Sequence, residues 1–401
     1  MKVALINSVA GYGSTGRIVD QLATMAGVEG KIYYGRKENL AHAETMRMTS
    51  FFGNAAHAGR TYLLDQHGFA NAQETRRMVK DLDSFAPDII HLHNLHGYYL
   101  HVGVLFSYLH QADVPVIWTF HDCWPFTGHC AHFESVGCQQ WRSCCTRFCP
   151  ALHHYPVSWN PFPIAAHFER KKALFTSLSP SRLTIVTPSA WLKRQVEESF
   201  FAKYDVRVIP TGIDRSIFKP VPASFRASNA LGDRFLLLAL ASTWTKEKGL
   251  DDLAALSRSL LADEVMVIVG LSAKQRRLFA KENVIMLPRL EDAQALCALY
   301  ASADVLLNPT YADTFPTVNL EAQACGCPVI TYRTGGSPDS LNADTGIVVD
   351  RGDRSALRAA ITAMKGKDRP RVRKACIQNA AGYETAAMLA AYAKLYDERM
   401  K

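Results

Sequence analysis

The sequence predicts an α/β protein built from two doubly wound domains, each with its own parallel sheet. Short apolar runs rich in β-branched residues alternate with longer helical patterns along the whole chain. This alternation favours parallel sheets covered by helices on both faces. The chain has 401 residues, which is too many for one ordinary domain and suits two. The alternation also falls into two series, and their join is expected near a polar segment at 210–231 that prolines interrupt.

The predicted strands set the domain boundaries. The first series comprises 3–6, 31–34, 89–92, 116–120 and 183–187. The second series comprises 206–209, 235–240, 266–269, 284–287, 305–307, 329–332 and 347–349. We therefore expect an N-terminal Rossmann-like domain at 1–205, with a cysteine-rich insert at 123–150, and a C-terminal Rossmann-like domain at 206–384. Residues 385–401 follow as an amphipathic helix with Tyr392 and Tyr396 on one face.

Composition narrows the class of protein. Apolar residues make up 48% and charged residues 20%, as in a globular enzyme. The net charge of +8 suits anionic substrates or an anionic membrane surface, but it is spread without a basic run, so no nucleic-acid partner is expected. The N-terminus is predicted to be a first strand rather than a secretory signal, and no apolar run is long enough to cross a bilayer. We expect a cytoplasmic protein whose charge permits peripheral contact with the inner membrane face.

Six of the ten cysteines lie within residues 123–149. In a cytosolic enzyme such crowding favours metal ligation over disulfides. A structural zinc knuckle is the hypothesis, and its candidate ligands are Cys130, Cys138, Cys144, Cys145 and Cys149. The spacing is not a standard paired signature, so free or partly oxidised thiols remain the alternative.

The most informative window lies at 308–339. A buried strand leads into a polar turn that carries Asp313, and a helix predicted to begin near Thr317 carries Glu321. The backbone N–H groups of residues 315–319 are expected to be free at the helix start, where they suit an anion. Two carboxylates that accept sugar hydroxyls, beside donors for a diphosphate, predict a nucleotide-sugar site.

This window resembles the acidic-x7-Glu motif of retaining glycosyltransferases of family 4, in which the first residue is usually Glu and is Asp313 here. Lys248-Gly249, at a predicted helix start, resembles the phosphate-binding Lys-Gly of that family. The family usually has an Arg five positions earlier, where this chain has Thr243. The resemblance covers nearly the whole chain, and the cysteine-rich insert is similar to that of bacterial exopolysaccharide enzymes of the colanic-acid type.

The resemblance implies the GT-B fold, with two Rossmann-like domains facing across a cleft and a final helix that crosses back to the first domain. It implies that the N-terminal domain binds the acceptor and the C-terminal domain binds the nucleotide sugar. Transfer would retain the anomeric configuration and would need no catalytic cofactor. The structural zinc is then the one bound group that the sequence predicts.

Residue roles follow from the same resemblance. Glu321 would hold the ribose hydroxyls, Asp313 the transferred sugar, and Lys248 the leaving diphosphate. His121, at the end of a predicted strand, would contact the donor sugar near the reaction centre. For His91 and His93, at the end of the preceding strand, two roles stay open: binding a ligand at the strand end, or a structural role with hydrogen bonds inside the sheet. The remaining donor-binding candidates are Gly11, Gly13, Thr243, Arg289, Phe315, Pro316, Thr317 and Val318.

The expected function is transfer of a sugar from a UDP- or GDP-linked donor to a saccharide or lipid-linked saccharide in bacterial surface polysaccharide biosynthesis. A non-catalytic nucleotide-sugar-binding protein is the main alternative, since one expected cation is missing at Thr243. A GT-B epimerase or a phosphorylase-like enzyme is a further alternative, although a phosphorylase requires a far longer chain.

Overall fold

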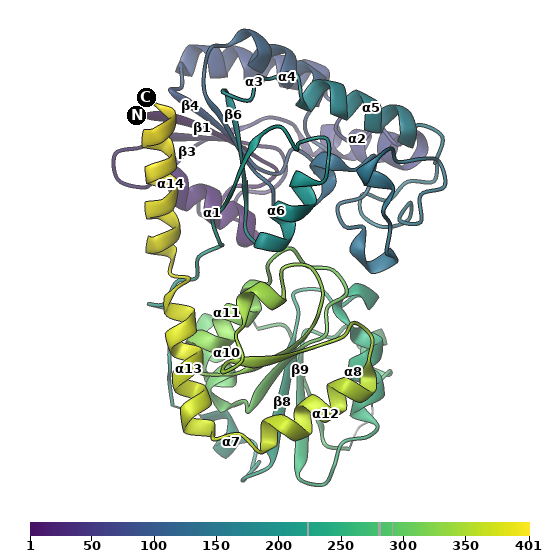
Figure 1. Ribbon diagram of the computed structural model, residues 1–401, viewed down its shortest axis with the longest axis vertical. Helices are drawn as coiled ribbons and strands as arrows, with labels where there is room; N and C mark the ends of the chain where they lie inside the picture. The colour runs from purple at the N-terminus through teal and green to yellow at the C-terminus, as the bar shows by residue number, and fades with distance from the viewer. Residues whose placement is uncertain (223, 280–281, 291) are drawn as a thin grey trace. The chain divides into compact units, whose positions relative to one another are not determined.

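The computed structural model describes residues 1–222, 224–279, 282–290 and 292–401 (Figure 1). These residues form two compact units. The first unit comprises Met1–Pro210 together with Leu389–Lys401, and the second comprises Thr211–Met388. The chain therefore returns to the first unit within its last helix.

An all-parallel, seven-stranded sheet forms the centre of the first unit, in the order β3-β2-β1-β4-β5-β6-β7. Its strands are β1 (Lys2–Asn7), β2 (Glu29–Tyr34), β3 (Glu44–Arg47), β4 (Ile89–Leu92), β5 (Val116–Thr119), β6 (Leu183–Thr187) and β7 (Asp205–Val208). The strand order reverses at β1, which lies between β2 and β4. Open α/β sheets bind ligands at the carboxyl ends of their strands beside such a reversal.

Helices cover both faces of this sheet. They are α1 (Gly13–Ala23), α2 (Phe51–Leu64), α3 (Ala72–Phe85), α4 (Val102–Gln111), α5 (Ile164–Phe175), α6 (Ala190–Glu197) and the C-terminal part of α14 (Thr385–Arg399). Figure 1 shows α3, α4 and α5 as a layer. Ile90 and Leu92 pack into the core beneath these helices. His91 points to the opposite face, as the period of two requires, and there it contacts Tyr396 of α14.

The second unit contains a six-stranded parallel sheet in the order β10-β9-β8-β11-β12-β13. Its strands are β8 (Phe235–Leu240), β9 (Glu264–Val269), β10 (Val284–Leu287), β11 (Val305–Asn308), β12 (Val329–Tyr332) and β13 (Gly346–Val349). Its helices are α7 (Ser224–Ser228), α8 (Leu250–Ser257), α9 (Ala273–Arg276), α10 (Ala293–Ser302), α11 (Thr317–Ala324), α12 (Arg354–Lys365) and α13 (Arg369–Ala381). Within this unit, α8 and α12 cover one face of the sheet, and α10, α11 and α13 cover the other (Figure 1).

The predicted fold class, two doubly wound α/β domains, is confirmed. One assignment is wrong: the strand expected at 206–209 to open the second domain is β7, which pairs with β6 at the edge of the first sheet. The strand β3 was not predicted, because Glu44–Arg47 is a short edge strand with no apolar run. None of the helices in the described ranges combines the length and apolar character that crossing a bilayer requires.

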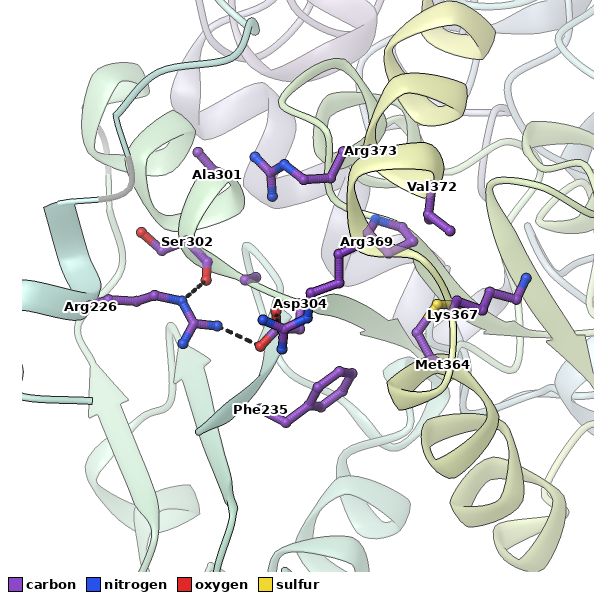
Figure 2. A pocket seen from close by; sticks show the side chains of 12 residues that line it. Arg226, Phe235, Ala301, Ser302, Asp304, Met364, Lys367, Arg369, Val372 and Arg373 are labelled. Atoms are coloured by element: carbon purple, nitrogen blue, oxygen red, sulfur yellow. Dashed lines mark hydrogen bonds and ion pairs between the residues drawn. The ribbon is translucent and has the colours of Figure 1, made fainter. Parts of the chain in front are cut away.

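A cavity of about 260 Å³ opens at the amino ends of β8, β11 and β12 (Figure 2). Asp304 at its base is ion-paired with Arg226 and with Arg369, and it also accepts a hydrogen bond from the backbone of Leu236. These contacts compensate the buried carboxylate. The cavity thus lies at the edge of the sheet opposite to the loops that carry Lys248 and Asp313.

Candidate functional site

In the second unit, Lys248 and Asp313 form an ion pair. Lys248 ends the short turn η4 (Lys246–Lys248) after β8, and Asp313 lies in the loop after β11. Because β8 and β11 are neighbours in a parallel sheet, their carboxyl ends bring these two loops together. The Nζ atom of Lys248 lies 2.8 Å from Oδ2 of Asp313, and both side chains are partly exposed. Two residues 65 positions apart, predicted to serve one substrate, are therefore in contact.

Backbone contacts hold the two loops in this register. The carbonyl of Glu247 accepts hydrogen bonds from the backbone N–H of Tyr311 at 2.6 Å and from the hydroxyl of Thr310 at 3.2 Å. Gly249 has a φ of +74°, and a Cβ atom there would lie 2.2 Å from the carbonyl oxygen of Pro309. Glycine after Lys248 is thus required by the close approach of the two loops as well as by its own conformation.

Asp313 also organises the start of α11. Its Oδ1 atom accepts the backbone N–H of Phe315 at 3.2 Å, and its carbonyl accepts the N–H of Gly336 at 3.0 Å. The expectation that all N–H groups of 315–319 are free is therefore wrong: the N–H of Phe315 is bound to Asp313, and that of Asn319 to the carbonyl of Pro316. The N–H groups of Phe315 and Asn319 are thus bound by a carboxylate and a carbonyl of the protein itself, and they are not available to a ligand.

Pro316, Thr317 and Val318 occupy the start of α11, with Pro316 as the N-cap residue. The N–H groups of Thr317 and Val318 are in the first turn, where the helix itself offers them no acceptor. The side chain of Phe315, by contrast, is buried against Leu320 and Ala324. Phe315 therefore has a structural role as well as any role beside a ligand.

Glu321 lies on the second turn of α11. Its Oε2 atom accepts a hydrogen bond of 3.1 Å from the hydroxyl of Tyr300, which is buried on α10. This bond orients the carboxylate. Burial and the nearby carboxylate raise the pKa of Tyr300 well above its usual value, so Tyr300 remains a donor at neutral pH.

A buried amide network fixes α11, and the sequence analysis did not identify it. Asn319 is fully buried; its Oδ1 accepts a bond from Asn308 at 2.8 Å, and its Nδ2 donates to Ser340 at 3.0 Å. Gln323 donates to the carbonyls of Asn319 and Ser340. The signal was present in the sequence as polar residues on the inner face of a helix with apolar neighbours.

Two other donor-site candidates lie further along the same edge of the sheet. Thr243 is exposed in the loop that leads to Lys248. Arg289 is exposed just after β10, and β9 separates β10 from β8. The structure thus places both residues after strand ends of the second sheet.

In the first unit, the glycine-rich turn after β1 leads into α1. Gly11 and Gly13 both have positive φ, +61° and +67°. A Cβ atom on Gly11 would lie 2.2 Å from the carbonyl oxygen of Asn39, whereas a Cβ atom on Gly13 would meet nothing within 4 Å. Gly11 is therefore explained by packing, and Gly13 leaves open space where a ligand can approach the backbone.

His121 follows β5 and is half-buried. Its Nε2 atom lies 3.0 Å from Nδ1 of His93, and the two rings are stacked. Burial lowers the pKa of His121 to about 4 and also lowers the pKa of His93. At neutral pH His121 is therefore an uncharged hydrogen-bonding group.

His91 packs against His93 of this pair and also contacts the C-terminal helix. Its Nδ1 lies 2.7 Å from the hydroxyl of Tyr396, and its Nε2 lies 2.8 Å from the hydroxyl of Thr119. Thr119 is also bonded to Tyr392 at 2.9 Å. Burial lowers the pKa of His91 to about 3. Of the two explanations for His91, the structural one is the one its contacts support.

A second histidine site next to His121 was missed. The Nε2 atom of His96 lies 2.6 Å from Oδ2 of Asp122, and its Nδ1 lies 3.1 Å from the hydroxyl of Tyr155. Burial alone would raise the pKa of Asp122, but the interactions with His96, with His132 and with the backbone N–H of Trp124 together lower it to about 2. An ionised carboxylate thus sits directly after His121. The residue types were visible in the sequence, but their pairing spans 26 positions across a β-strand.

The cysteine-rich segment folds as part of the first unit's core. Phe126, Phe133 and Trp141 are buried in one cluster with Cys130 and Cys145. The segment contains the short turns η1 (Trp124–Phe126), η2 (Glu134–Val136) and η3 (Gln140–Arg142). Aromatic burial therefore stabilises the segment.

All five candidate zinc ligands are free thiols. Burial raises the pKa of Cys130, that of Cys145 to about 12 and that of Cys149 to about 11. In the described residues no group of three or more His, Cys, Asp or Glu side chains is arranged to hold a metal ion. Zinc in this segment therefore stays a prediction, which metal analysis can test.

Comparison with known sequences assigns both units to one kind of enzyme. Residues 32–217 match the family described as Glycosyltransferase Family 4, and residues 234–365 match the family described as Glycosyl transferases group 1. A protein of Escherichia coli K12, named as the colanic acid biosynthesis glycosyl transferase WcaC, is 24% identical over 361 residues, which is 84% of each chain. A GDP-mannose-dependent mannosyltransferase of Mycolicibacterium smegmatis that acts on phosphatidylinositol monomannoside is 28% identical over 272 residues, covering 63% of this chain and 67% of the relative.

Solved structures agree on the fold. Sucrose-phosphate synthase from Thermosynechococcus elongatus superposes with a TM-score of 0.70 at 18% identity, covering 99% of this chain and 98% of the other. The Anabaena HepE protein in complex with UDP superposes with a TM-score of 0.67 at 14% identity, covering 99% of both chains. These similarities confirm the predicted GT-B class of two Rossmann-like domains. The chain belongs to glycosyltransferase family 4, and it is a glycosyltransferase.

Proposed function

We propose that this enzyme transfers a hexose, with retention of configuration, from a UDP- or GDP-linked donor to a saccharide or lipid-linked saccharide during synthesis of a bacterial surface polysaccharide. The Lys248–Asp313 contact carries the proposal, since it joins a cation suited to a diphosphate with a carboxylate suited to sugar hydroxyls. The similarity to WcaC, which is named for colanic acid biosynthesis, supports the pathway, and the HepE structures in complex with UDP and with UDP-glucose support a nucleotide-sugar donor.

In the proposed mechanism, Lys248 and Asp313 compensate each other's charge until the donor binds. The donor diphosphate then binds the ammonium group of Lys248 and accepts hydrogen bonds from the N–H groups of Thr317 and Val318. Asp313 accepts hydroxyls of the transferred sugar, and Glu321, oriented by Tyr300, accepts those of the ribose. As the glycosidic bond breaks, negative charge grows on the diphosphate, and Lys248 and the start of α11 stabilise it.

On the first unit, Gly13 leaves its backbone open to a ligand, and neutral His121 can donate to or accept from a hydroxyl of a bound sugar. No catalytic metal or other cofactor is part of the proposal. The alternative of a non-catalytic binding protein has no support from the comparisons, whose relatives are named as glycosyltransferases.

Nucleotide-sugar titration and product analysis test this proposal. Calorimetry with UDP- and GDP-sugars should identify one preferred base, and the enzyme should hydrolyse that donor slowly without acceptor. NMR of the glycoside product should show the anomeric configuration of the donor. Inverted product would refute retention, and absence of binding to every nucleotide sugar would refute the assignment of the donor site.

We also propose peripheral membrane contact through the first unit, at the cytoplasmic face expected from the sequence. Phe51 and Phe52 at the start of α2 are 73% and 82% exposed. Near the other end of the helix, Trp159 is 67% exposed, donates its backbone N–H to the carbonyl of Tyr62 and packs on that ring at 5.7 Å. Exposed aromatic side chains on an amphipathic surface favour the membrane interface.

Vesicle co-sedimentation tests the membrane contact. Phe51→Ser combined with Phe52→Ser should reduce binding to anionic vesicles several-fold. Leu261→Ser, which alters an exposed apolar residue of the second unit, is the matched control and should leave binding unchanged. Equal binding by all three proteins would contradict the proposal.

A further inference from the structure

A cavity of about 470 Å³ lies in the first unit, beside the turn that contains Gly11 and Gly13. It is lined by Tyr12, Tyr34, Arg36, Lys37, Glu38, Asn39 and Arg47. Tyr12 follows β1, and Tyr34 is the last residue of β2. The segment 36–39 follows β2, and Arg47 is the last residue of β3. The cavity is therefore at the ligand-binding edge of the first sheet, and no role has yet been assigned to it.

The lining has three cations and one acid. Both carboxylate oxygens of Glu38 are already engaged, Oε2 by the hydroxyl of Tyr34 at 2.7 Å and Oε1 by the hydroxyl of Thr45 at 3.3 Å. Among the described residues, Arg36 has no carboxylate within ion-pair distance, and the same holds for the other two cations. The cavity thus has a surplus of positive charge and of unused N–H donors, which suits an anion.

The other two cations are held in place by their neighbours. The Nζ atom of Lys37 lies 4.9 Å from the centre of the Tyr12 ring, and the Nε atom of Arg47 donates to the carbonyl of Thr49 at 3.0 Å. The contact with Thr49 uses only one of the five donors of Arg47. The terminal nitrogens of Arg47 therefore remain available for a ligand.

Hydrogen bonds between the loops preform the floor of the cavity. The N–H of Ala10 donates to the carbonyl of Lys37 at 3.0 Å, and the N–H of Asn39 donates to the carbonyl of Ala10 at 3.1 Å. The close packing of Gly11 on Asn39 adds to this contact. A ligand bound here pays little for ordering the loops, because they are already joined.

Arg36 links the cavity to the histidine site of the same unit. Its Cδ atom would lie 3.5 Å from a Cβ atom on Gly97, which is the residue after His96. His96 in turn is bonded to Asp122, next to His121. The cationic cavity and the proposed reacting region of the first unit are therefore adjacent within one rigid edge of the sheet.

We propose that this cavity binds the phosphate or diphosphate group of the acceptor, so that the acceptor is a phosphate-linked saccharide. The inference rests on the proposed glycosyl transfer and specifies its acceptor. The guanidinium groups of Arg36 and Arg47 match phosphate oxygens in pairs, and Lys37 adds a point charge. The same phosphate chemistry is available from a lipid headgroup, and the experiment below separates the two sources.

Hydrogen exchange of the full-length protein with inorganic pyrophosphate tests the site directly. Pyrophosphate should protect peptides that span 34–47, and Arg36→Ala combined with Arg47→Ala should weaken this protection at least tenfold. Lys80→Ala, which removes an exposed cation on α3, is the matched control and should behave as the wild type. Peptides that span 309–321 report the donor site separately. Pyrophosphate protection of 34–47 that is absent, or that is equal in the double variant, would overturn the proposal.

Transfer assays then identify the source of the phosphate. With a polyprenyl-diphosphate-linked hexose as acceptor, the double variant should raise KM at least tenfold and leave donor hydrolysis unchanged. With an alkyl hexoside that lacks phosphate, the variant and the wild type should have equal KM. Protection of 34–47 by phosphatidylglycerol vesicles, without the KM difference, would assign the cavity to headgroups and overturn the acceptor assignment. Absence of donor hydrolysis by the wild type would refute the proposed function itself, and the acceptor assignment with it, whatever pyrophosphate protects.

Discussion

Replacing Lys248 with alanine separates catalysis from folding at the donor site. The ammonium group of Lys248 lies 2.8 Å from Asp313, and these side chains are 37% and 20% exposed. A pair this accessible contributes only about 0–1 kcal/mol to folding, because solvent screens it. Asp313 also keeps its bond to the backbone of Phe315 in the variant, so the loop retains a second anchor.

The expected effect on turnover is much larger. A fixed cation that meets charge developing on a diphosphate is worth ~3 kcal/mol in the transition state, by analogy with the removal of one oxyanion donor. At about 1.4 kcal/mol per factor of ten, Lys248→Ala should lose on the order of a hundredfold in kcat. The free energy of unfolding should fall by less than about 1 kcal/mol.

The assay is release of nucleoside diphosphate from the preferred donor, run beside urea unfolding of the same samples. Lys246→Ala, two residues earlier in the same turn, is the matched control and should keep nearly normal turnover. Near-normal turnover of Lys248→Ala would refute the assigned role. An equal loss in the Lys246 variant would show that the turn, rather than the ammonium group, was disrupted.

Four further outcomes are expected. Asn319→Ala removes two buried amide bonds below α11 and leaves Ser340 without its donor, so urea unfolding should show a loss of about 1–3 kcal/mol and calorimetry a weaker donor affinity. The folded pKa of His91 is about 3, below its unfolded value of 6.5, so its share of stability is complete above pH 6.5 and lost as pH falls. This share should make unfolding at pH 5 easier than at pH 7 by roughly 2 kcal/mol, in addition to the shares of the other buried histidines, and His91→Gln should reduce the pH 7 to pH 5 difference by about that amount. Tyr396→Phe should cost about 1 kcal/mol in the same measurement, because it deletes one buried hydrogen bond to His91. If the cysteine segment is a zinc knuckle, elemental analysis will find about one zinc per chain, and metal-free protein with an unchanged melting temperature would end that hypothesis.

The local patterns of the donor loops were sufficient to predict that Lys248 and Asp313 each lie just after a strand of the second domain. Lys248-Gly249 follows one strand and Asp313 follows another, and parallel neighbours necessarily present their carboxyl ends together. The sequence could not show which acceptor each backbone N–H group at the start of α11 binds. The bond from Phe315 to Asp313 depends on the turn adopted by the intervening residue, and a pattern of residue types does not determine that turn.

The boundary between the domains was misplaced for a related reason. The run at 206–209 has the apolar and β-branched character of a strand, but nothing in it specifies which sheet it joins. In the structure, β7 continues the first sheet beside β6, where Ile185 pairs with Val206. Strand identity is a local property, whereas sheet membership depends on pairing between distant segments.

The C-terminal helix also has a local feature that the sequence predicts and distant contacts that it does not. The spacing of Tyr392 and Tyr396 predicted a buried face, and both are buried. Their partners, Thr119 and His91, lie more than 270 residues earlier, so only the fold could reveal them. These hydroxyls satisfy polar groups inside the first sheet that would otherwise be buried without partners, at about 1–3 kcal/mol each. Because His91 packs against His93, which contacts His121, the last helix completes the support of a proposed catalytic histidine. The helix is therefore an integral layer of the first domain rather than an appendage to the second.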